Sequence, residues 1–251
     1  MGERALSFGP VAESYERYRL GYPAELADTV LAYAGRPIRT ALEIGAGTGK
    51  ATRLFVARGI AVTATDPDPA MLAELRKRVP GAEAREAALE DLRPERQHDL
   101  VYAAASLHWT DGNGRWDRIA AQLAPGGVFA SFGGPARLAD PAVAQAIQAA
   151  HAQFLESDEI PSPDGTPPDD VLQWPGTELE KSALFADVRQ VVVDRRQAMT
   201  SDEYVARLST VSAYLMLPIP VREQVFQRIR EVLPGTVEVN ADLTLHLARR
   251  L

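Results

Sequence analysis

The amino-acid sequence predicts an α/β fold with a mostly parallel sheet, from three observations made between residue 39 and about residue 134. Short apolar segments rich in β-branched residues alternate there with helical patterns, the connections between them are short, and glycines stand at the turns. This alternation is typical of βαβ units, whose right-handed crossovers place successive strands in one parallel sheet.

The elements of this first part follow one another in a regular order. The first expected strand, residues 40–44, runs directly into a glycine-rich turn, and a helix over residues 50–58 follows it and ends at Gly59. Further strands are expected at 60–65, 82–85, 99–105 and 128–132, and further helices at 69–79 and 117–123.

After Gly134 the pattern changes. An alanine-rich helix over 141–156 precedes a proline-rich loop over 157–176, and a loop of this length in a compact domain is usually a functional lid or a mobile connection. The remaining expected elements are a strand at 188–195, two or three helices between 201 and 233 with Ser201 as the first cap, and strand-like alternation over 236–249.

Composition excludes several classes of chemistry. The chain has 251 residues, 46% of them hydrophobic, and no cysteine, so it has no disulfide framework, no thiolate zinc site and no cysteine nucleophile. The net charge of −7 disfavours a surface that tracks nucleic-acid phosphates. No segment approaches the ~20 apolar residues of a membrane span, and the acidic first residues do not resemble a signal peptide. We therefore expect a cytoplasmic protein.

The sharpest local feature is the series Gly45-x-Gly47-x-Gly49 in the first strand-to-helix turn. Glycines there allow positive φ and a close approach of the backbone to a ligand. A P-loop has four residues between its first glycine and its Gly-Lys pair, and a Ser or Thr follows the lysine. Here only three residues separate Gly45 from Gly49, and Ala51 follows Lys50. A dinucleotide fingerprint has its third glycine one residue later. A tight turn without a ligand is the remaining alternative.

Two acidic residues extend this pattern. Glu43 precedes the first glycine by two positions, and the series E-x-G-x-G-x-G resembles motif I of the class I S-adenosylmethionine-dependent methyltransferases. Asp66 ends the second expected strand, where a carboxylate can accept hydrogen bonds from both hydroxyls of a ribose. Nicotinamide enzymes use the same position, and a simple turn and helix cap is the alternative for Asp66.

Two later segments carry the same resemblance. Residues 90–92 and 99–101 are similar to the motif II region of the family, which implies that the backbone near Leu89 and Glu90 faces the adenine. Ala88 stands where many relatives have an aspartate that binds the adenine amino group, so side-chain recognition of the adenine is not expected. Residues 123–127 resemble the segment that precedes the fifth strand in the family.

Two further segments resemble one branch of the family. The pattern from Phe8 to Pro23 and the segment 106–109 are similar to the type-11 branch, which includes trans-aconitate methyltransferases. This resemblance implies a Rossmann-like class I methyltransferase fold, with a seven-stranded mostly parallel sheet, helices on both faces and a helical lid insertion. We expect one structural domain, in which cap helices (1–38) and a cofactor-binding core (39–134) precede residues 135–251, which hold the rest of the sheet and a lid at about 135–180 and 200–235.

The resemblance further implies that the cofactor is S-adenosylmethionine. Tyr15 and Arg19 lie four residues apart on one face of the first helix, from which they can reach the methionine carboxylate or an anionic substrate. Met71 lies on the helix that would pass the adenine, with core packing as its alternative. The expected cofactor-binding residues are Tyr15, Arg19, Glu43, Gly45, Ala46, Gly47, Gly49, Asp66, Pro67, Met71, Leu89, Glu90 and Ala104.

His108 is the candidate catalytic base, because imidazole titrates near neutrality and His108 follows the fourth strand, where the methyl group should point. A structural role beside Trp109 is equally open. His98, His151 and His246 lack acidic or histidine neighbours at ligand spacing, so we expect surface or structural roles for them and no metal site. The expected acceptor-binding residues are Tyr22, His108, Trp109, Trp174, Tyr214 and Met216.

The function predicted from these residues is methylation of a small molecule by S-adenosylmethionine, at a carboxylate or hydroxyl oxygen of a metabolite or natural product. N- or C-methylation, a cyclisation or rearrangement on the same fold, and a non-enzymatic binding protein are the alternatives. The expected partner is the small-molecule acceptor, with neither nucleic acid nor membrane, and both a monomer and a homodimer agree with the sequence.

Overall fold

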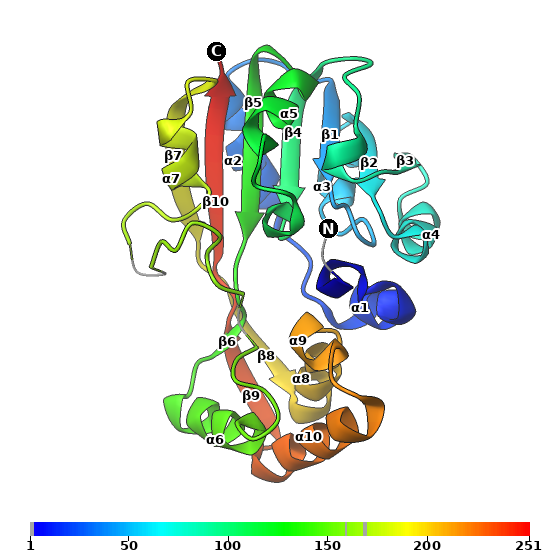
Figure 1. The fold of residues 1–251 in the computed structure, drawn as a ribbon, viewed down its shortest axis with the longest axis vertical. Helices are drawn as coiled ribbons and strands as arrows, with labels where there is room; N and C mark the ends of the chain where they lie inside the picture. The colour runs from blue at the N-terminus through cyan, green and yellow to red at the C-terminus, as the bar shows by residue number, and fades with distance from the viewer. Residues whose placement is uncertain (1–2, 159, 168–169) are drawn as a thin grey trace.

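A computed structural model describes residues 3–158, 160–167 and 170–251. A large sheet with helices on both faces forms one end of the molecule, and a smaller sheet with its own helices forms the other (Figure 1). The strands of the large sheet lie in the order β3 (Glu83–Glu86), β2 (Ala61–Asp66), β1 (Thr40–Ile44), β4 (His98–Ala104), β5 (Leu123–Gly133), β10 (Leu243–Arg250) and β7 (Phe185–Val193).

The large sheet is parallel except at β10, which runs antiparallel to both β5 and β7. The expected seven-stranded, mostly parallel sheet is therefore confirmed, and the order 3-2-1-4-5-10-7 reverses direction next to β1. In sheets of this kind ligands bind beyond the carboxyl ends of the parallel strands, beside such a reversal.

Alternating side chains on the central strands build the two cores on either side of the sheet. Leu42 and Ile44 face one core, whereas Ala41 belongs to the other, because successive residues of a strand point to opposite faces. The first core contains Leu26 and Val30 and lies under α2 (Ala24–Ala34), α3 (Thr52–Val56) and α4 (Pro69–Arg78). The second lies under α5 (Arg115–Gln122) and α7 (Gly176–Lys181).

This arrangement corrects the expectation that residues 1–38 form one cap. Helix α2 is buried against the large sheet, since its apolar residues share the core of the central strands. Only the preceding segment lies between the two ends of the molecule (Figure 1), and it consists of η1 (Glu3–Leu6), η2 (Gly9–Val11) and α1 (Ala12–Tyr18).

We call residues 137–151 and 196–240 the small subdomain. Its antiparallel sheet has the order β6 (Arg137–Leu138), β9 (Thr236–Asn240) and β8 (Arg196–Thr200). A separate hydrophobic core that includes Val205 and Phe226 joins this sheet to the surrounding helices. These helices are α6 (Pro141–His151), α8 (Ser201–Leu208), α9 (Ser212–Leu215) and α10 (Ile219–Val232).

The limits of the small subdomain differ from those expected for the lid. The alternation over 236–249 is two strands, and the break follows Asn240, where Asp242 accepts a hydrogen bond from the backbone of Arg195 (2.7 Å). At the other limit, α7 packs its buried Leu179 into a core of the large sheet, so residues 176–181 belong to that end of the molecule.

The helix ends also differ in places from the sequence expectations. Thr200, and not Ser201, caps α8, because its hydroxyl accepts from the backbone of Glu203 while the Glu203 side chain accepts from the backbone of Thr200. Helix α6 ends at His151, five residues before the expected end. Among the helices of the described ranges, none is both long and apolar enough to cross a bilayer.

Candidate active site

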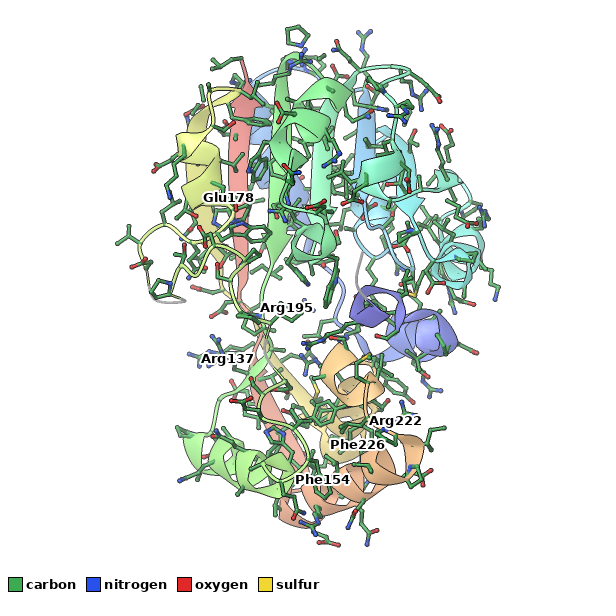
Figure 2. The ribbon with its side chains drawn as sticks, in the orientation of Figure 1. Arg137, Phe154, Glu178, Arg195, Arg222 and Phe226 are labelled. Carbon is green, nitrogen blue, oxygen red and sulfur yellow. The ribbon has the colours of Figure 1, made fainter. Side chains whose placement is uncertain are left out.

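A large cavity lies between the carboxyl ends of the central strands, the N-terminal segment and the small subdomain. Its volume of about 1120 Å³ exceeds the roughly 300–1,000 Å³ of ordinary small-molecule sites, so it has room for a cofactor and an acceptor together. Arg137, which borders this cavity, lies near the junction between the two ends of the molecule (Figure 2). A smaller cavity of about 100 Å³ shares several of its lining residues, Gly45 and Gly47 among them.

The glycine turn after β1 forms one wall of the large cavity. Gly45, Gly47 and Gly49 have φ angles of 65°, 55° and 86°, a region that favours glycine over other residues. A Cβ on Gly45 would stand 2.5 Å from the Cβ of Ser106, so no larger residue fits there. Gly49 borders neither cavity, because it packs against Leu75 of α4, and its role is to bring helix and turn together.

Asp66 fixes the geometry of this turn. At the end of β2 its two carboxylate oxygens accept hydrogen bonds from the backbone of Gly47 (2.8 Å) and of Asp68 (2.9 Å). Burial raises the pKa of Asp66 to about 6, although both of these bonds act to lower it. Asp66 borders the large cavity, and each carboxylate oxygen can accept more than one hydrogen bond, so the two hydroxyls of a ribose can bind there as well.

Glu43 is buried below the same turn. One of its oxygens, Oε2, accepts from the hydroxyls of Thr52 (2.6 Å) and Tyr102 (2.8 Å), whereas Oε1 has no hydrogen-bond partner among the described residues. Burial raises the pKa of Glu43 to about 8, and the charge of Asp66 acts in the same direction. Glu43 borders the small cavity together with Ala46, so the unpaired oxygen can accept from a cationic donor placed there.

The segment after β3 forms the opposite wall. Ala88 and Leu89 border the large cavity together with Pro67 and Met71. Glu90 does not border it, and its carboxylate accepts a hydrogen bond from the backbone of Asp111 (2.6 Å). A flat apolar ring system would therefore meet backbone groups and apolar side chains on this side of the cavity.

Helix α1 is held against the glycine turn by Glu16. Its carboxylate accepts from the hydroxyl of Thr48 (2.6 Å) and from Arg53 (2.6 Å), and its backbone carbonyl accepts from Lys50 (2.6 Å). The same helix brings Tyr15 to the cavity wall, so the turn and the N-terminal segment form one unit.

Arg19, which follows α1, extends to the small subdomain. Its Nε and Nη2 donate to the hydroxyl and the carbonyl of Thr210, each at 2.9 Å, and its guanidinium lies over the ring of Tyr15. Arg19 borders both cavities, so this single side chain connects the N-terminal segment, the cavity wall and the end of α8.

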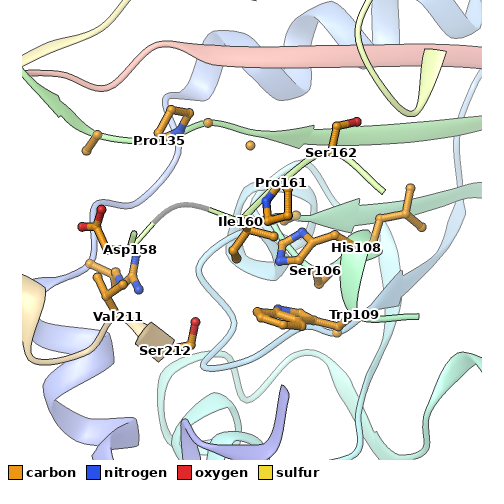
Figure 3. Close-up of a pocket in the computed structure, with 18 of the residues that line it drawn as sticks. Ser106, His108, Trp109, Pro135, Asp158, Ile160, Pro161, Ser162, Val211 and Ser212 are labelled. Carbon is orange, nitrogen blue, oxygen red and sulfur yellow. The ribbon is translucent and has the colours of Figure 1, made fainter. Parts of the chain in front are cut away.

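His108 and Trp109 stand together at the carboxyl end of β4, in η4 (Leu107–Trp109) (Figure 3). Their ring centroids are 4.5 Å apart, and both residues border the large cavity. Burial lowers the pKa of His108 to about 4, with smaller contributions from the charges of Arg4 and Arg115. The imidazole is therefore neutral at physiological pH, and its Nε2 has no hydrogen-bond partner among the described residues.

The structure separates the other residues expected at the acceptor site. Trp174 borders the large cavity, and its ring lies under the guanidinium of Arg115. Tyr22 borders the small cavity. Tyr214 is fully buried in the core of the small subdomain, and Met216 is exposed to solvent, so neither lies on a cavity wall.

Several charged or titratable residues at the cavity were not expected there from the sequence. His151 and His246 border the large cavity, as does Arg207 of α8, which is only 7% exposed. Arg207 follows the buried Tyr204 by three residues, so a cationic side chain on the apolar face of a helix is the sequence signal that could have identified it. Within the described ranges no group of three or more histidine, aspartate or glutamate side chains could hold a metal ion.

Comparisons with known proteins agree with this geometry. Residues 42–129 match a methyltransferase domain family. An uncharacterized methyltransferase from Mycobacterium tuberculosis (strain H37Rv) is 31% identical over 232 residues, which cover 92% of this chain and 87% of that protein. A trans-aconitate 2-methyltransferase from Methylobacterium nodulans is 36% identical over 124 residues, 48% of this chain and 42% of that protein.

The fold likewise matches solved structures. One from Anaeromyxobacter dehalogenans, named as a type II methyltransferase, has a TM-score of 0.62 at 23% identity and covers 92% of this chain and 98% of its own. This likeness concerns the fold, whereas the mycobacterial relative shows the family. The chain thus belongs to the class I S-adenosylmethionine-dependent methyltransferases.

Proposed function

We propose that the protein transfers the methyl group of S-adenosylmethionine to an oxygen atom, a carboxylate or a hydroxyl, of a small-molecule acceptor. One observation carries this proposal: a neutral imidazole with an unpaired ring nitrogen, His108 Nε2, borders the same cavity as the glycine turn and Asp66. A hydroxyl can give its proton to that nitrogen or accept a hydrogen bond from it, according to the tautomer.

The residues of the cavity fit the cofactor. Glycines 45 and 47 leave space for a ligand against the backbone, and Asp66 offers carboxylate oxygens for a ribose. The unpaired Oε1 of Glu43 can accept a hydrogen bond from the ammonium of a methionine moiety, and that cation would favour the ionised carboxylate over the protonated form that burial favours in the free protein. The bound cofactor supplies an electrophilic methyl group on a positively charged sulfur.

Positioning of the acceptor is the main contribution of the chain. Holding an oxygen in line with the methyl carbon can supply on the order of 7–11 kcal/mol of the barrier in the best intramolecular cases. Proton removal by His108 would add about 10²–10⁴-fold for a hydroxyl acceptor, whereas a carboxylate is already ionised at neutral pH and needs no base. Trp109 borders the same cavity beside His108, and its aromatic ring would attract the positive charge of a sulfonium placed there.

The relatives support a carboxylate as the first acceptor to test. The Methylobacterium nodulans protein is named for methylation of trans-aconitate, a tricarboxylic acid. We propose that this protein methylates a carboxylate oxygen of its acceptor. The cavity volume of about 1120 Å³ leaves room for an acceptor larger than trans-aconitate.

Mass spectrometry tests the reaction class directly. The purified protein is incubated with S-adenosylmethionine and a panel of carboxylic acids and hydroxylated acceptors, beginning with trans-aconitate. We expect one product that gains a methyl group on oxygen while S-adenosylhomocysteine is released in equal amount. A methylated nitrogen or carbon, or a product whose mass equals that of its substrate, would contradict O-methylation.

A further inference from the structure

Arg207 is a buried cation for which the described residues supply no ion-pair partner. It lies on α8 of the small subdomain and is 7% exposed, and it borders both cavities. Among the described residues, no carboxylate forms an ion pair with its guanidinium and no group accepts a hydrogen bond from it. A buried arginine is almost always paired, because the guanidinium loses its hydration and needs hydrogen-bond acceptors in exchange.

The charges that face Arg207 come from several elements. The charge of Arg19 lowers the pKa of Arg207, whereas Asp158 of the long loop and the hydroxyls of Tyr204 and Tyr214 raise it. Burial, followed by the charge of Arg19, lowers the pKa of Arg207 to about 10. The guanidinium thus remains charged at neutral pH, next to a second guanidinium whose Nε and Nη2 already donate to Thr210.

We propose that Arg207 binds a carboxylate group of the methyl acceptor, with Arg19 as its neighbour in the same anion subsite. This inference rests on the proposed function, because it specifies the acceptor as an anion that enters the large cavity beneath α8.

The chemistry around Arg207 favours a single carboxylate. A planar guanidinium whose donors are engaged by no described residue matches the two oxygens of a carboxylate in a bidentate pair. The small subdomain contributes both apolar side chains, such as Ile147 and Leu208, and polar side chains, such as Gln148 and Tyr204, to the large cavity that Arg207 borders.

The position of Arg207 favours the acceptor as the source of this carboxylate. Its helix neighbours Tyr204 and Leu208 border the large cavity and not the small one, so this part of α8 faces the space beyond the cofactor-binding turn. The methionine carboxylate of the cofactor is the second source of the same chemistry, because Arg207 also borders the small cavity beside Glu43. The experiment separates the two.

Calorimetric titration of the protein saturated with S-adenosylhomocysteine measures the binding of ligands at this subsite without turnover. The probes are trans-aconitate and its neutral trimethyl ester, and the variants are Arg207→Gln, Arg207→Lys and the matched control Arg230→Gln. Arg230 is exposed on α10 of the same subdomain and borders neither cavity. We expect Arg207→Gln to weaken trans-aconitate roughly 10- to 100-fold, the scale for lost hydrogen bonds to a charged group.

The other arms have defined outcomes. Arg207→Lys should lose less affinity than Arg207→Gln, the Arg230→Gln variant should bind as the wild type does, and the ester should bind weakly to all of them. Equal affinity of the wild type and Arg207→Gln for trans-aconitate, including the absence of binding to both, would overturn the proposal. Thermal unfolding checks that each variant is folded, and Arg207→Lys keeps the test valid if Arg207→Gln is not.

Two further measurements distinguish the rival partners of Arg207. Arg207→Gln could weaken the binding of S-adenosylhomocysteine but not that of 5′-methylthioadenosine, which lacks the amino-acid moiety. In that case Arg207 binds the carboxylate of the cofactor, and its assignment to the acceptor fails. If Asp158→Asn weakens trans-aconitate as much as Arg207→Gln does, Asp158 orders the site and Arg207 is not the anion receptor. Binding through Arg207 without methylation would preserve the subsite and refute carboxylate methylation, so the two proposals can fail separately.

Discussion

Glu16 on the N-terminal helix accepts a hydrogen bond of 2.6 Å from the hydroxyl of Thr48, inside the glycine turn. Thr48 is almost fully buried, and the Glu16 side chain is only 8% exposed, so solvent does not screen this contact effectively. Helix α1, which carries Tyr15 and is followed by Arg19, is therefore fixed to the glycine turn. Cofactor binding and closure of the N-terminal segment should be coupled through this bond.

Glu16→Gln should weaken the binding of S-adenosylhomocysteine by roughly 3- to 10-fold, the range for one partly buried hydrogen-bond network. The change keeps the size of the side chain but removes its charge from Lys50 and Arg53. Glu13→Gln is the matched control, because Glu13 lies exposed on the same helix. Equal dissociation constants for the two variants in calorimetry would show that the anchor does not affect the cofactor.

The same contact predicts an acid effect. Burial alone would raise the pKa of Glu16, but hydrogen bonds from Thr48 and Arg53 and the charges of Lys50 and Arg53 hold it below its usual value of 4.5. A carboxylate with a depressed pKa adds stability above its unfolded pKa and loses it as the pH falls through the folded pKa. The difference in unfolding free energy between wild type and Glu16→Gln should therefore shrink below pH 4.5.

Glu43→Gln should remove a pH dependence from cofactor binding. Because the pKa of Glu43 is raised to about 8, the free protein holds its proton at neutral pH, and an ammonium beside Oε1 favours the ionised form. The wild type should therefore bind S-adenosylhomocysteine more tightly as the pH rises from 6 to 8. In Glu43→Gln this trend should vanish and affinity should fall by about 1–3 kcal/mol.

Controls make the Glu43 result specific. 5′-Methylthioadenosine lacks the ammonium, so Glu43→Gln should not change its affinity, and Glu86→Gln at the exposed end of β3 should behave as wild type. The sign for stability is the opposite of that for Glu16. A raised carboxyl pKa gives stability that is present below 4.5 and lost as the pH rises through about 8, so Glu43→Gln should make the unfolding free energy less dependent on pH across that window.

The large sheet, and the cavity wall formed by the glycine turn and Asp66, were predictable because the sequence patterns that specify each strand and turn are short. Gly45 and Gly47 need positive φ within one turn, and Asp66 ends a strand whose pairing with β1 places it beside that turn. The glycines stand within five consecutive residues, and Asp66 follows at the end of the next strand, so the order of strand, turn and strand in the sequence identifies this wall. The same holds for the alternation of β1, β4 and β5, whose side chains divide between the two cores.

The small subdomain was less predictable because its geometry depends on contacts between distant segments. Arg207 and Tyr214 are seven residues apart, yet one borders the cavity and the other is buried in the core, since the chain turns between α8 and α9. Within that turn, Thr210 accepts a hydrogen bond from Arg19, which lies 191 positions away in the sequence. No periodicity within residues 201–233 contains this information.

Tyr214→Phe should destabilise the small subdomain without weakening the binding of the cofactor. Its hydroxyl lies 2.8 Å from Nδ1 of His151, and removal leaves a buried ring nitrogen unpaired at a cost of about 1–3 kcal/mol. Tyr204→Phe is the control, because no described residue bonds the Tyr204 hydroxyl. Urea unfolding should show the loss only for Tyr214→Phe. A raised dissociation constant for S-adenosylhomocysteine in that variant would instead support the expected role of Tyr214 in the cavity wall.

His108 should give a pH–rate profile that lacks the usual histidine inflection. With its pKa lowered to about 4, the imidazole is already neutral at pH 5, so kcat/KM for a hydroxyl acceptor should stay level from about pH 5 to 8 and fall only toward pH 4. His108→Gln should lower kcat by about 10²–10⁴-fold if the ring removes a proton. An inflection near 6.5 would mean that His108 is hydrated in the working enzyme.

The identity of the acceptor atom decides how His108 acts, and a second variant separates the cases. His98→Gln is the control, since His98 is also buried with an unpaired nitrogen but lies at the start of β4, away from both cavities. For a carboxylate acceptor, His108→Gln should retain most of its kcat, because the amide can still donate a hydrogen bond and no proton has to leave. His108→Ala should then lose more than His108→Gln. Equal losses in both variants would instead identify proton removal as the role of the imidazole.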